Sequence, residues 1–246
     1  MQQADNTSPE CILLAGIAGG LGSALLENVS WRFPAAQLLT IGHADSPSPA
    51  KNLQHLTATL SEPESSTQVA EWLQDKPLPN WVIHCSGVLH WSGHQPEKNL
   101  QQCTDAALLQ SMAINVLSHM HLAQAVAPLL RRHSPFTWAS LSAKVGSIED
   151  NQLGGWYSYR MSKAALNMLV RNLSIEWGRK VDTCRVVAIH PGTTDTALSK
   201  PFQKNIPADK LYTPAQSADR IVAVLEHLRD TDTGKLLFWD GTHLPW

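Results

Sequence analysis

Tyr159 and Lys163, four positions apart, are the residues of this chain best suited to proton transfer. Residues four apart on a helix share a face, so the Lys163 ammonium can lie beside the Tyr159 phenol. A free phenol has a pKa of about 10 and rarely loses its proton at neutral pH, whereas a nearby cation lowers that pKa. The pair therefore predicts a group that can protonate a carbonyl. The alternative without a catalytic role is a surface lysine beside an interfacial tyrosine. Tyr157 is a rival phenol, but it lies six positions before Lys163 and on a different part of the helix.

A glycine-rich turn follows the first apolar run, Cys11–Ala15, with glycines at 16, 19, 20 and 22. Residues 21–29 then read as a helix, so the order is strand, turn, helix. The first N–H groups of such a helix have no partner within it and favour the pyrophosphate of a dinucleotide. A plain strand-to-helix turn needs one or two glycines, so four of them within seven residues favour the phosphate site over that alternative.

Short apolar runs alternate with helical patterns along the rest of the chain. We expect strands at 36–41, 53–60, 81–85, 136–141, 184–189 and 236–239, and helices at 65–73, 105–130, 156–177 and 215–228. The alternation predicts an α/β fold, a single Rossmann-type doubly wound parallel sheet flanked by helices on both faces. We expect residues 1–9 to be a flexible N-terminal tail and residues 10–246 to form one dinucleotide-binding and catalytic domain.

Composition argues against several classes of protein. The formal net charge of −2 leaves no basic stripe for nucleic acid, and the chain has no long apolar run typical of a membrane protein. Four cysteines without C-x-x-C spacing and a polar start without a secretory pattern lead us to expect a cytoplasmic protein. Eleven histidines lack metal-ligand spacing, so we expect no metal site.

Read in order, Gly-x-x-x-Gly-x-Gly near the start and Tyr-x-x-x-Lys later resemble the short-chain dehydrogenase/reductase family over essentially the whole chain. Further pieces of the resemblance follow the expected elements: Ser86–Gly87, Asn115, Ser142 and Pro191–Thr196. The resemblance implies that Tyr159 is the general acid in carbonyl reduction and the general base in alcohol oxidation. It also implies that Lys163 holds the nicotinamide ribose and depresses the Tyr159 pKa, and that Asn115 orders a water in a proton relay. The implied cofactor contacts are Gly16, Gly20, Leu21, Gly22, His43, Ser86, Gly87, Tyr159, Lys163, Pro191, Gly192, Thr194 and Thr196.

The serine position departs from the family pattern. The reactive hydroxyl of the family usually lies three residues before a glycine, and here Ala143 has that place relative to Gly146. We expect Ser142 to bond the substrate oxygen instead, with Ser147 as the alternative and residues 149–155 as an insertion that absorbs the extra length. After the fourth strand, His84-Cys85-Ser86-Gly87 replaces the frequent Asn-Asn-Ala-Gly, which alters the polar bracing of the cofactor pocket.

Cofactor choice depends on the residues about 20 positions past the glycine turn. An acidic residue there would hold the ribose 2′-hydroxyl of NAD and repel a 2′-phosphate. Gly42 and His43 have that place, so NADP is favoured over NAD, with His43 as a partner for the phosphate. Asp45 is close enough to reverse this preference, and His43 could equally be a solvated loop residue.

The resulting hypothesis is an NAD(P)-dependent oxidoreductase that interconverts a carbonyl and an alcohol on a small or medium apolar molecule, through Tyr159, Lys163, Asn115 and Ser142. One alternative is a catalytically weak or silent dinucleotide-binding protein of the same fold with a sensing or signalling role, and another is a non-redox epimerase or dehydratase. Residues 197–212 are expected to close over the substrate, and the aromatic segment 239–246 to form an interface or a pocket wall. By the resemblance, we expect a homodimer or homotetramer.

Overall fold

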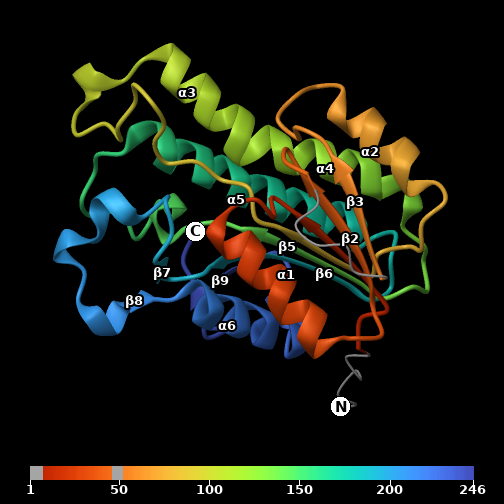
Figure 1. The fold of residues 1–246 in the computed structure, drawn as a ribbon. Coiled ribbons are helices and arrows are strands. Elements are labelled where there is room, and N and C mark those ends of the chain that lie inside the picture. Colours follow the sequence, from red (N-terminus) through yellow and green to blue (C-terminus); the bar gives the residue numbers. More distant parts are fainter. Residues whose placement is uncertain (1–7, 46–51) are drawn as a thin grey trace.

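The computed structural model describes residues 8–45 and 52–246, which contain an eight-stranded sheet with the strand order β10-β9-β6-β5-β4-β1-β2-β3 (Figure 1). The pairs from β3 to β9 are parallel, and β10 runs antiparallel to β9. A second sheet pairs β7 with β8. Residues 1–7 of the expected tail lie outside the described residues. The strands are β1 (Cys11–Ala15), β2 (Gln37–Gly42), β3 (Leu53–Thr57), β4 (Trp81–His84), β5 (Phe136–Leu141), β6 (Cys184–His190), β7 (Thr193–Thr194), β8 (Leu211–Tyr212), β9 (Leu236–Phe238) and β10 (His243–Leu244).

Helices cover both faces of the large sheet. Helices α1 and α6 lie on one face, where Leu25 and Ile221 are buried, and α2 to α5 lie on the other, where Leu122 and Val170 are buried (Figure 1). The helices are α1 (Gly20–Arg32), α2 (Ser65–Leu73), α3 (Asp105–Met112), α4 (Ser118–Val126), α5 (Tyr157–Trp177) and α6 (Pro214–Glu226). Shorter helical turns are η1 (Leu100–Gln102), η2 (Ala113–Leu117), η3 (Ala127–Leu129), η4 (Lys144–Gly146), η5 (Lys200–Asn205), η6 (Ala208–Lys210) and η7 (Asp230–Asp232).

This architecture confirms the predicted fold class, a doubly wound and mostly parallel sheet. The helix expected at 105–130 is interrupted, because η2 is a π-helical turn in which the amide of Ser118 donates to the carbonyl of Ala113. The strand expected at 53–60 ends at Thr57. In the described residues, no helix has both the length and the apolar character needed to cross a membrane.

Strand order reverses between β1 and β4, and parallel sheets open a crevice beyond the strand ends at such a point. The glycine-rich turn lies there. A Cβ built on Gly16 would stand 2.6 Å from the amide nitrogen of Ser86, and one built on Gly22 would stand 2.3 Å from the carbonyl oxygen of Gly16. Only glycine permits both close approaches, so these residues draw the start of α1 tightly against the ends of β1 and β4.

Candidate active site

Helix α5 carries Tyr159 and Lys163 to the edge of the sheet where β4, β5 and β6 end. Tyr159 is 8% exposed and Lys163 is 3% exposed. The Lys163 Nζ donates a hydrogen bond of 2.9 Å to the carbonyl of Leu141 and lies 5.9 Å from the centroid of the Tyr159 ring. The Tyr159 hydroxyl has no hydrogen-bond partner among the described residues. The phenol is therefore available to a bound molecule.

Burial controls the protonation of this pair. Desolvation raises the pKa of Tyr159 and lowers the pKa of Lys163 to about 7. The expectation that Lys163 depresses the Tyr159 pKa is wrong for the protein without ligand. The ammonium is turned to the Leu141 carbonyl, and the loss of water around the phenol outweighs its attraction for a charge 5.9 Å from the ring.

Asn115 links the loop after β4 to α5. Its Oδ1 accepts from the Val88 amide at 2.7 Å, and its Nδ2 donates to the Val88 carbonyl and to Ser162 Oγ, both at 2.9 Å. Ser162 Oγ in turn donates to the Tyr159 carbonyl at 2.9 Å. Asn115 is fully buried in the π-helical turn η2, and its side chain joins the backbone at Val88 to Ser162 on the turn of α5 that precedes Lys163.

Several of the expected cofactor residues lie together in the crevice. A Cβ built on Gly87 would stand 3.2 Å from Lys163 Nζ and 3.4 Å from Asn115 Oδ1. A Cβ on Gly20 would stand 3.2 Å from Thr196 Cγ2, so the segment after β6 reaches the glycine-rich turn. These contacts place both halves of the expected site along one crevice.

Other expected cofactor residues have fewer contacts that connect them to the crevice. His43 is exposed at the end of β2, and Leu21 is half-buried against the core beneath α1. Pro191 and Gly192 follow β6 at the crevice. The hydroxyl of Thr194, by contrast, shares a hydrogen bond of 2.7 Å with Ser217 on α6, and Thr194 is buried. Its side chain therefore serves the packing of α6.

The structure does not bring the Ser142 hydroxyl to Tyr159. Ser142 Oγ donates to Asn167 Oδ1 at 2.6 Å, one helical turn beyond Lys163. Ala143 is in extended conformation, so its side chain points opposite to that of Ser142, and it packs against Tyr159. Ser147, the alternative, is buried and its Oγ accepts from the Asp150 amide at 3.1 Å. A methyl group therefore stands where a hydroxyl was expected.

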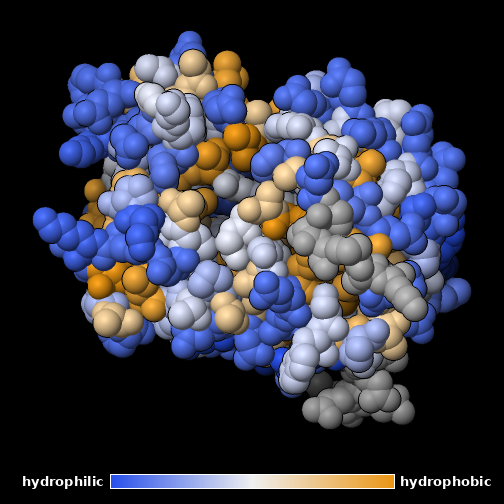
Figure 2. Space-filling view, viewed as in Figure 1, coloured by the Kyte–Doolittle hydropathy of each residue, from blue (hydrophilic) through white to orange (hydrophobic). Residues whose placement is uncertain are grey.

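Apolar side chains surround the phenol. Figure 2 shows apolar side chains around a hollow on the face that carries this edge of the sheet. Phe202 belongs to the segment 197–212 that is expected to cover the substrate, whereas Leu89 and Trp156 were not expected near the phenol. Apolar residues in irregular loops carry no periodicity that would have identified them. The apolar side chains that pack around Tyr159 are Leu89, Ala143, Val145, Trp156, Leu198 and Phe202.

Two buried histidines lie below the crevice. The rings of His84 and His119 stack with centroids 3.6 Å apart, and His119 also contacts Ser140 Oγ at 3.0 Å and the Ser86 carbonyl at 3.3 Å. Desolvation lowers the pKa of His84 to about 3 and that of His119 well below its usual value. This neutral stack supports the Ser86–Gly87 turn from below in place of the asparagine pair that the family frequently has.

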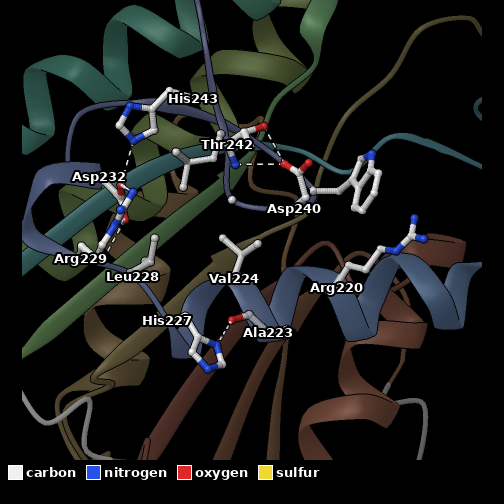
Figure 3. A pocket seen from close by; sticks show the side chains of 13 residues that line it. Arg220, Ala223, Val224, His227, Leu228, Arg229, Asp232, Asp240, Thr242 and His243 are labelled. Carbon is white, nitrogen blue, oxygen red and sulfur yellow. Dashed lines mark hydrogen bonds and ion pairs between the residues drawn. The ribbon is translucent and has the colours of Figure 1, made fainter.

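A separate hollow of about 900 Å³ lies between α6 and the turn that joins β9 to β10 (Figure 3). Its acidic groups have partners in the protein: Asp232 Oδ1 accepts from Arg229 and His243, and Asp240 Oδ1 accepts from Thr242. At its rim, the Arg220 guanidinium lies 4.0 Å from the ring centroids of both Tyr212 and Trp239. Trp239 of the expected C-terminal segment therefore packs against the end of segment 197–212.

The glycine-rich turn at the switch point of a doubly wound sheet, with a buried Tyr-Lys pair beside it, defines a Rossmann-type α/β protein. Comparison with known proteins identifies the family within this class. The model of a family described as enoyl-(acyl carrier protein) reductase matches residues 60–241. A protein of Rhodococcus sp. (strain AD45) named 1-hydroxy-2-glutathionyl-2-methyl-3-butene dehydrogenase is 35% identical over 189 residues, which are 76% of this chain and 77% of that protein. The chain belongs to the short-chain dehydrogenase/reductase family and is an oxidoreductase of that family.

Further similarities extend this comparison. The C-signal protein of Myxococcus xanthus is 31% identical over 141 residues, which are 57% of this chain and 80% of that protein. The structure of NADPH-bound carbonyl reductase from chicken fatty liver superimposes with a TM-score of 0.79 at 23% identity, covering 96% of this chain and 99% of that one. The carbonyl reductase Sniffer of D. melanogaster gives a TM-score of 0.79 at 22% identity, with coverage of 97% and 100%. At these identities the two structures confirm the fold.

Proposed function

We propose that the protein is an NADP-preferring oxidoreductase that interconverts a carbonyl and an alcohol on a small or medium apolar molecule, with Tyr159 as the proton donor in reduction. The observation that carries the proposal is the Tyr159 hydroxyl. It has no partner among the described residues, and burial among apolar side chains raises its pKa. A phenol in this state keeps its proton at neutral pH, and its free O–H can donate to a carbonyl oxygen. The raised pKa makes it a weaker acid than a free phenol, so the proton is expected to move only as hydride transfer makes that oxygen basic. A positioned acid of this kind contributes about 10² to 10⁴ in rate.

The crevice fits a nicotinamide dinucleotide. The N-cap of α1 is Gly19, whose lack of a side chain leaves the first N–H groups of the helix open to a pyrophosphate. Lys163 Nζ has three donors and one hydrogen-bond acceptor among the described residues, the Leu141 carbonyl, so two donors remain for ribose hydroxyls beside Gly87. When bound, the dinucleotide supplies the hydride.

The preference for NADP over NAD rests on the end of β2. Gly42 and His43 are found where a carboxylate would bind the 2′-hydroxyl, and His43 is exposed. Two of the similar structures are described as containing NADP or NADPH, which supports the same choice. NAD remains the alternative cofactor, since Asp45 follows two positions later.

In this proposal Lys163 orients the dinucleotide, and Asn115 keeps the start of α5 and the loop after β4 in register. Ser142 takes no part, because its hydroxyl is bonded to Asn167. The absence of a hydroxyl at Ala143 favours a second candidate, a weak or silent dinucleotide-binding protein with a sensing role. The first candidate predicts turnover of a carbonyl compound, and the second predicts dinucleotide binding without turnover.

The test measures oxidation of NADPH and NADH with a panel of aliphatic and aromatic aldehydes and ketones. The proposal expects turnover with at least one compound, faster with NADPH, and a loss of at least a hundredfold in kcat for Tyr159→Phe. Dinucleotide binding to the Tyr159→Phe variant, followed by fluorescence, controls for its fold. Tight dinucleotide binding without turnover on the whole panel would favour the silent protein.

We also propose that α5 pairs subunits in a homodimer or homotetramer. Met161, Met168 and Ile175 lie at intervals of seven on this helix and are 44%, 60% and 42% exposed. Side chains at this spacing form a stripe along one side of a helix, and such a stripe can pack against the same stripe of a second copy. Sedimentation of the wild type and of Met168→Glu measures the assembly, and an unchanged monomer in both would refute this pairing.

A further inference from the structure

A buried carboxyl group stands at the start of the helix that carries Tyr159, and the proposed reaction does not use it. Glu97 is 1% exposed and belongs to the loop between β4 and α3. The Ser158 amide donates to Glu97 Oε2 at 3.2 Å, and Ser158 Oγ donates to Glu97 Oε1. The positive end of the α5 dipole adds to these bonds. The carboxyl group therefore fixes the residue that directly precedes Tyr159.

The same residue holds Trp156 in an unusual backbone conformation. Trp156 has φ 51° and ψ 43°, the left-handed region, and it is the non-glycine residue with positive φ in the described chain. A residue with a Cβ stays there only when its surroundings hold it. Here the Trp156 amide donates to the main-chain carbonyl of Glu97. Glu97 thus binds the backbone at Trp156 through its carbonyl and at Ser158 through its carboxyl group.

The conformation of Trp156 places its ring between the phenol and Phe202. Its ring lies 5.0 Å from that of Phe202 and 6.3 Å from that of Tyr159, measured between centroids. It therefore fills the space between the phenol and η5 of the segment expected to cover the substrate. Leu89 and Ala143 also pack against the phenol. Ala143 offers a substrate no hydrogen bond. Recognition of a substrate beside Tyr159 should therefore depend more on the shape of the surrounding side chains and on contact with the aromatic rings.

We propose that Glu97 is a positioning residue that holds Trp156 and the start of α5, and that the wall it holds selects flat, apolar carbonyl compounds. This inference rests on the proposed carbonyl reduction for its substrate class. The placement of Trp156 by Glu97 does not depend on the proposed function and can be tested without turnover. A merely structural Glu97 would affect stability and leave the choice among substrates unchanged.

The kinetic test compares Glu97→Ala and Glu97→Gln with the wild type and with Glu71→Gln, an exposed control on α2. Each enzyme is assayed with NADPH, an aromatic aldehyde and a small aliphatic aldehyde. In Glu97→Ala we expect kcat/KM for the aromatic aldehyde to fall about tenfold more than for the aliphatic one, since Ser158 loses both bonds to the carboxyl group and the main-chain bond from Trp156 to residue 97 is left to hold the wall alone. Glu97→Gln keeps an acceptor for Ser158 Oγ and should give an intermediate loss. NADPH affinity should stay within about twofold, because the dinucleotide is held elsewhere along the crevice.

A second measurement needs no turnover. Hydrogen exchange of the peptide 154–160 should become about tenfold faster in Glu97→Ala and less so in Glu97→Gln, while Glu71→Gln matches the wild type. If Glu97→Ala fails to fold, Ser158→Ala provides the same two readouts, because it removes one bond to the carboxyl group and leaves Glu97 in place. Unchanged exchange at 154–160, or an unchanged ratio between the two aldehydes, overturns the inference. A wild type that reduces no carbonyl compound refutes the proposed function, and exchange then decides the placement of Trp156 by itself.

Discussion

Replacement of Lys163 by methionine should change how stability depends on pH. Methionine has a similar length and no charge, so the variant removes the buried ammonium and its bond to the Leu141 carbonyl. The pKa of Lys163 in the folded protein is about 7, against 10.5 for an ordinary lysine. The folded state therefore binds fewer protons than the unfolded state between these two values, and wild-type stability rises with pH across that window.

The size of the effect follows from the two pKa values. One pKa unit corresponds to about 1.4 kcal/mol, and the interval from pH 7 to pH 9 spans two units of the window, with Lys163 partly titrated at its lower end. The free energy of unfolding of the wild type should therefore rise by roughly 2 kcal/mol relative to Lys163→Met between pH 7 and pH 9. Burial raises the pKa of Cys11, Cys85 and Cys184 to about 12, but these thiols are common to both proteins and cancel in the difference.

Urea unfolding at pH 6, 7, 8 and 9 measures the difference, with Lys98→Met as the control for loss of an exposed lysine. The control should run parallel to the wild type at every pH. Parallel profiles for Lys163→Met as well would refute the reasoning, since they would mean that Lys163 keeps its proton through this range. The assay contains no nucleotide, because any ligand that binds the folded state alters stability by mass action.

Two other variants test the remaining chemistry of the site. Ala143→Ser should raise kcat/KM for a carbonyl compound, on the order of tenfold, by adding a donor beside Tyr159. Ser142→Ala should instead cost about 1 kcal/mol of stability through loss of the bond to Asn167 and leave kcat/KM within about twofold; the opposite pattern would return Ser142 to the catalytic group. His84→Asn should resist acid better than the wild type. The folded pKa of His84, about 3, lies below its usual 6.5, so wild-type stability is lost as pH falls through that window, by roughly 2 kcal/mol from pH 6.5 to 4.5. Urea midpoints of the two proteins over this range measure the difference in stability. An equal loss of stability in the wild type and in His84→Asn would contradict the prediction.

Most of the sheet could be predicted because its strands are short apolar runs between breakers. The runs at Cys11–Ala15 and Phe136–Leu141 coincide with β1 and β5, and the helix at Ser65–Leu73 coincides with α2. Strands β7, β8 and β10 have two residues each, too few for alternation to be visible. The π-helical turn at Asn115 also left no trace in the pattern, since one extra residue in a turn hardly disturbs helical periodicity.

The site was harder to predict than the fold, because spacing alone cannot give the direction of a side chain. The Tyr-Lys pair does lie on one face of α5, as the interval of four requires. Ser142 and Ala143 are neighbours in the sequence, yet the extended backbone sends them to opposite sides. The sign of the Tyr159 pKa shift depended on burial, and burial depends on loops such as the one that carries Leu89.

Both ends of the segment from Asp195 to Tyr212 are fastened to the body of the protein. Thr193 and Thr194 pair with Leu211 and Tyr212, and the Arg220 guanidinium lies against the Tyr212 ring. If the proposed function holds, we expect a molecule that reaches Tyr159 to displace only the middle of this segment, around Phe202, while the pairing of β7 with β8 is kept. The rates at which such a molecule enters and leaves should then depend on how easily the contact between Phe202 and Trp156 opens. They should not depend on separation of paired strands.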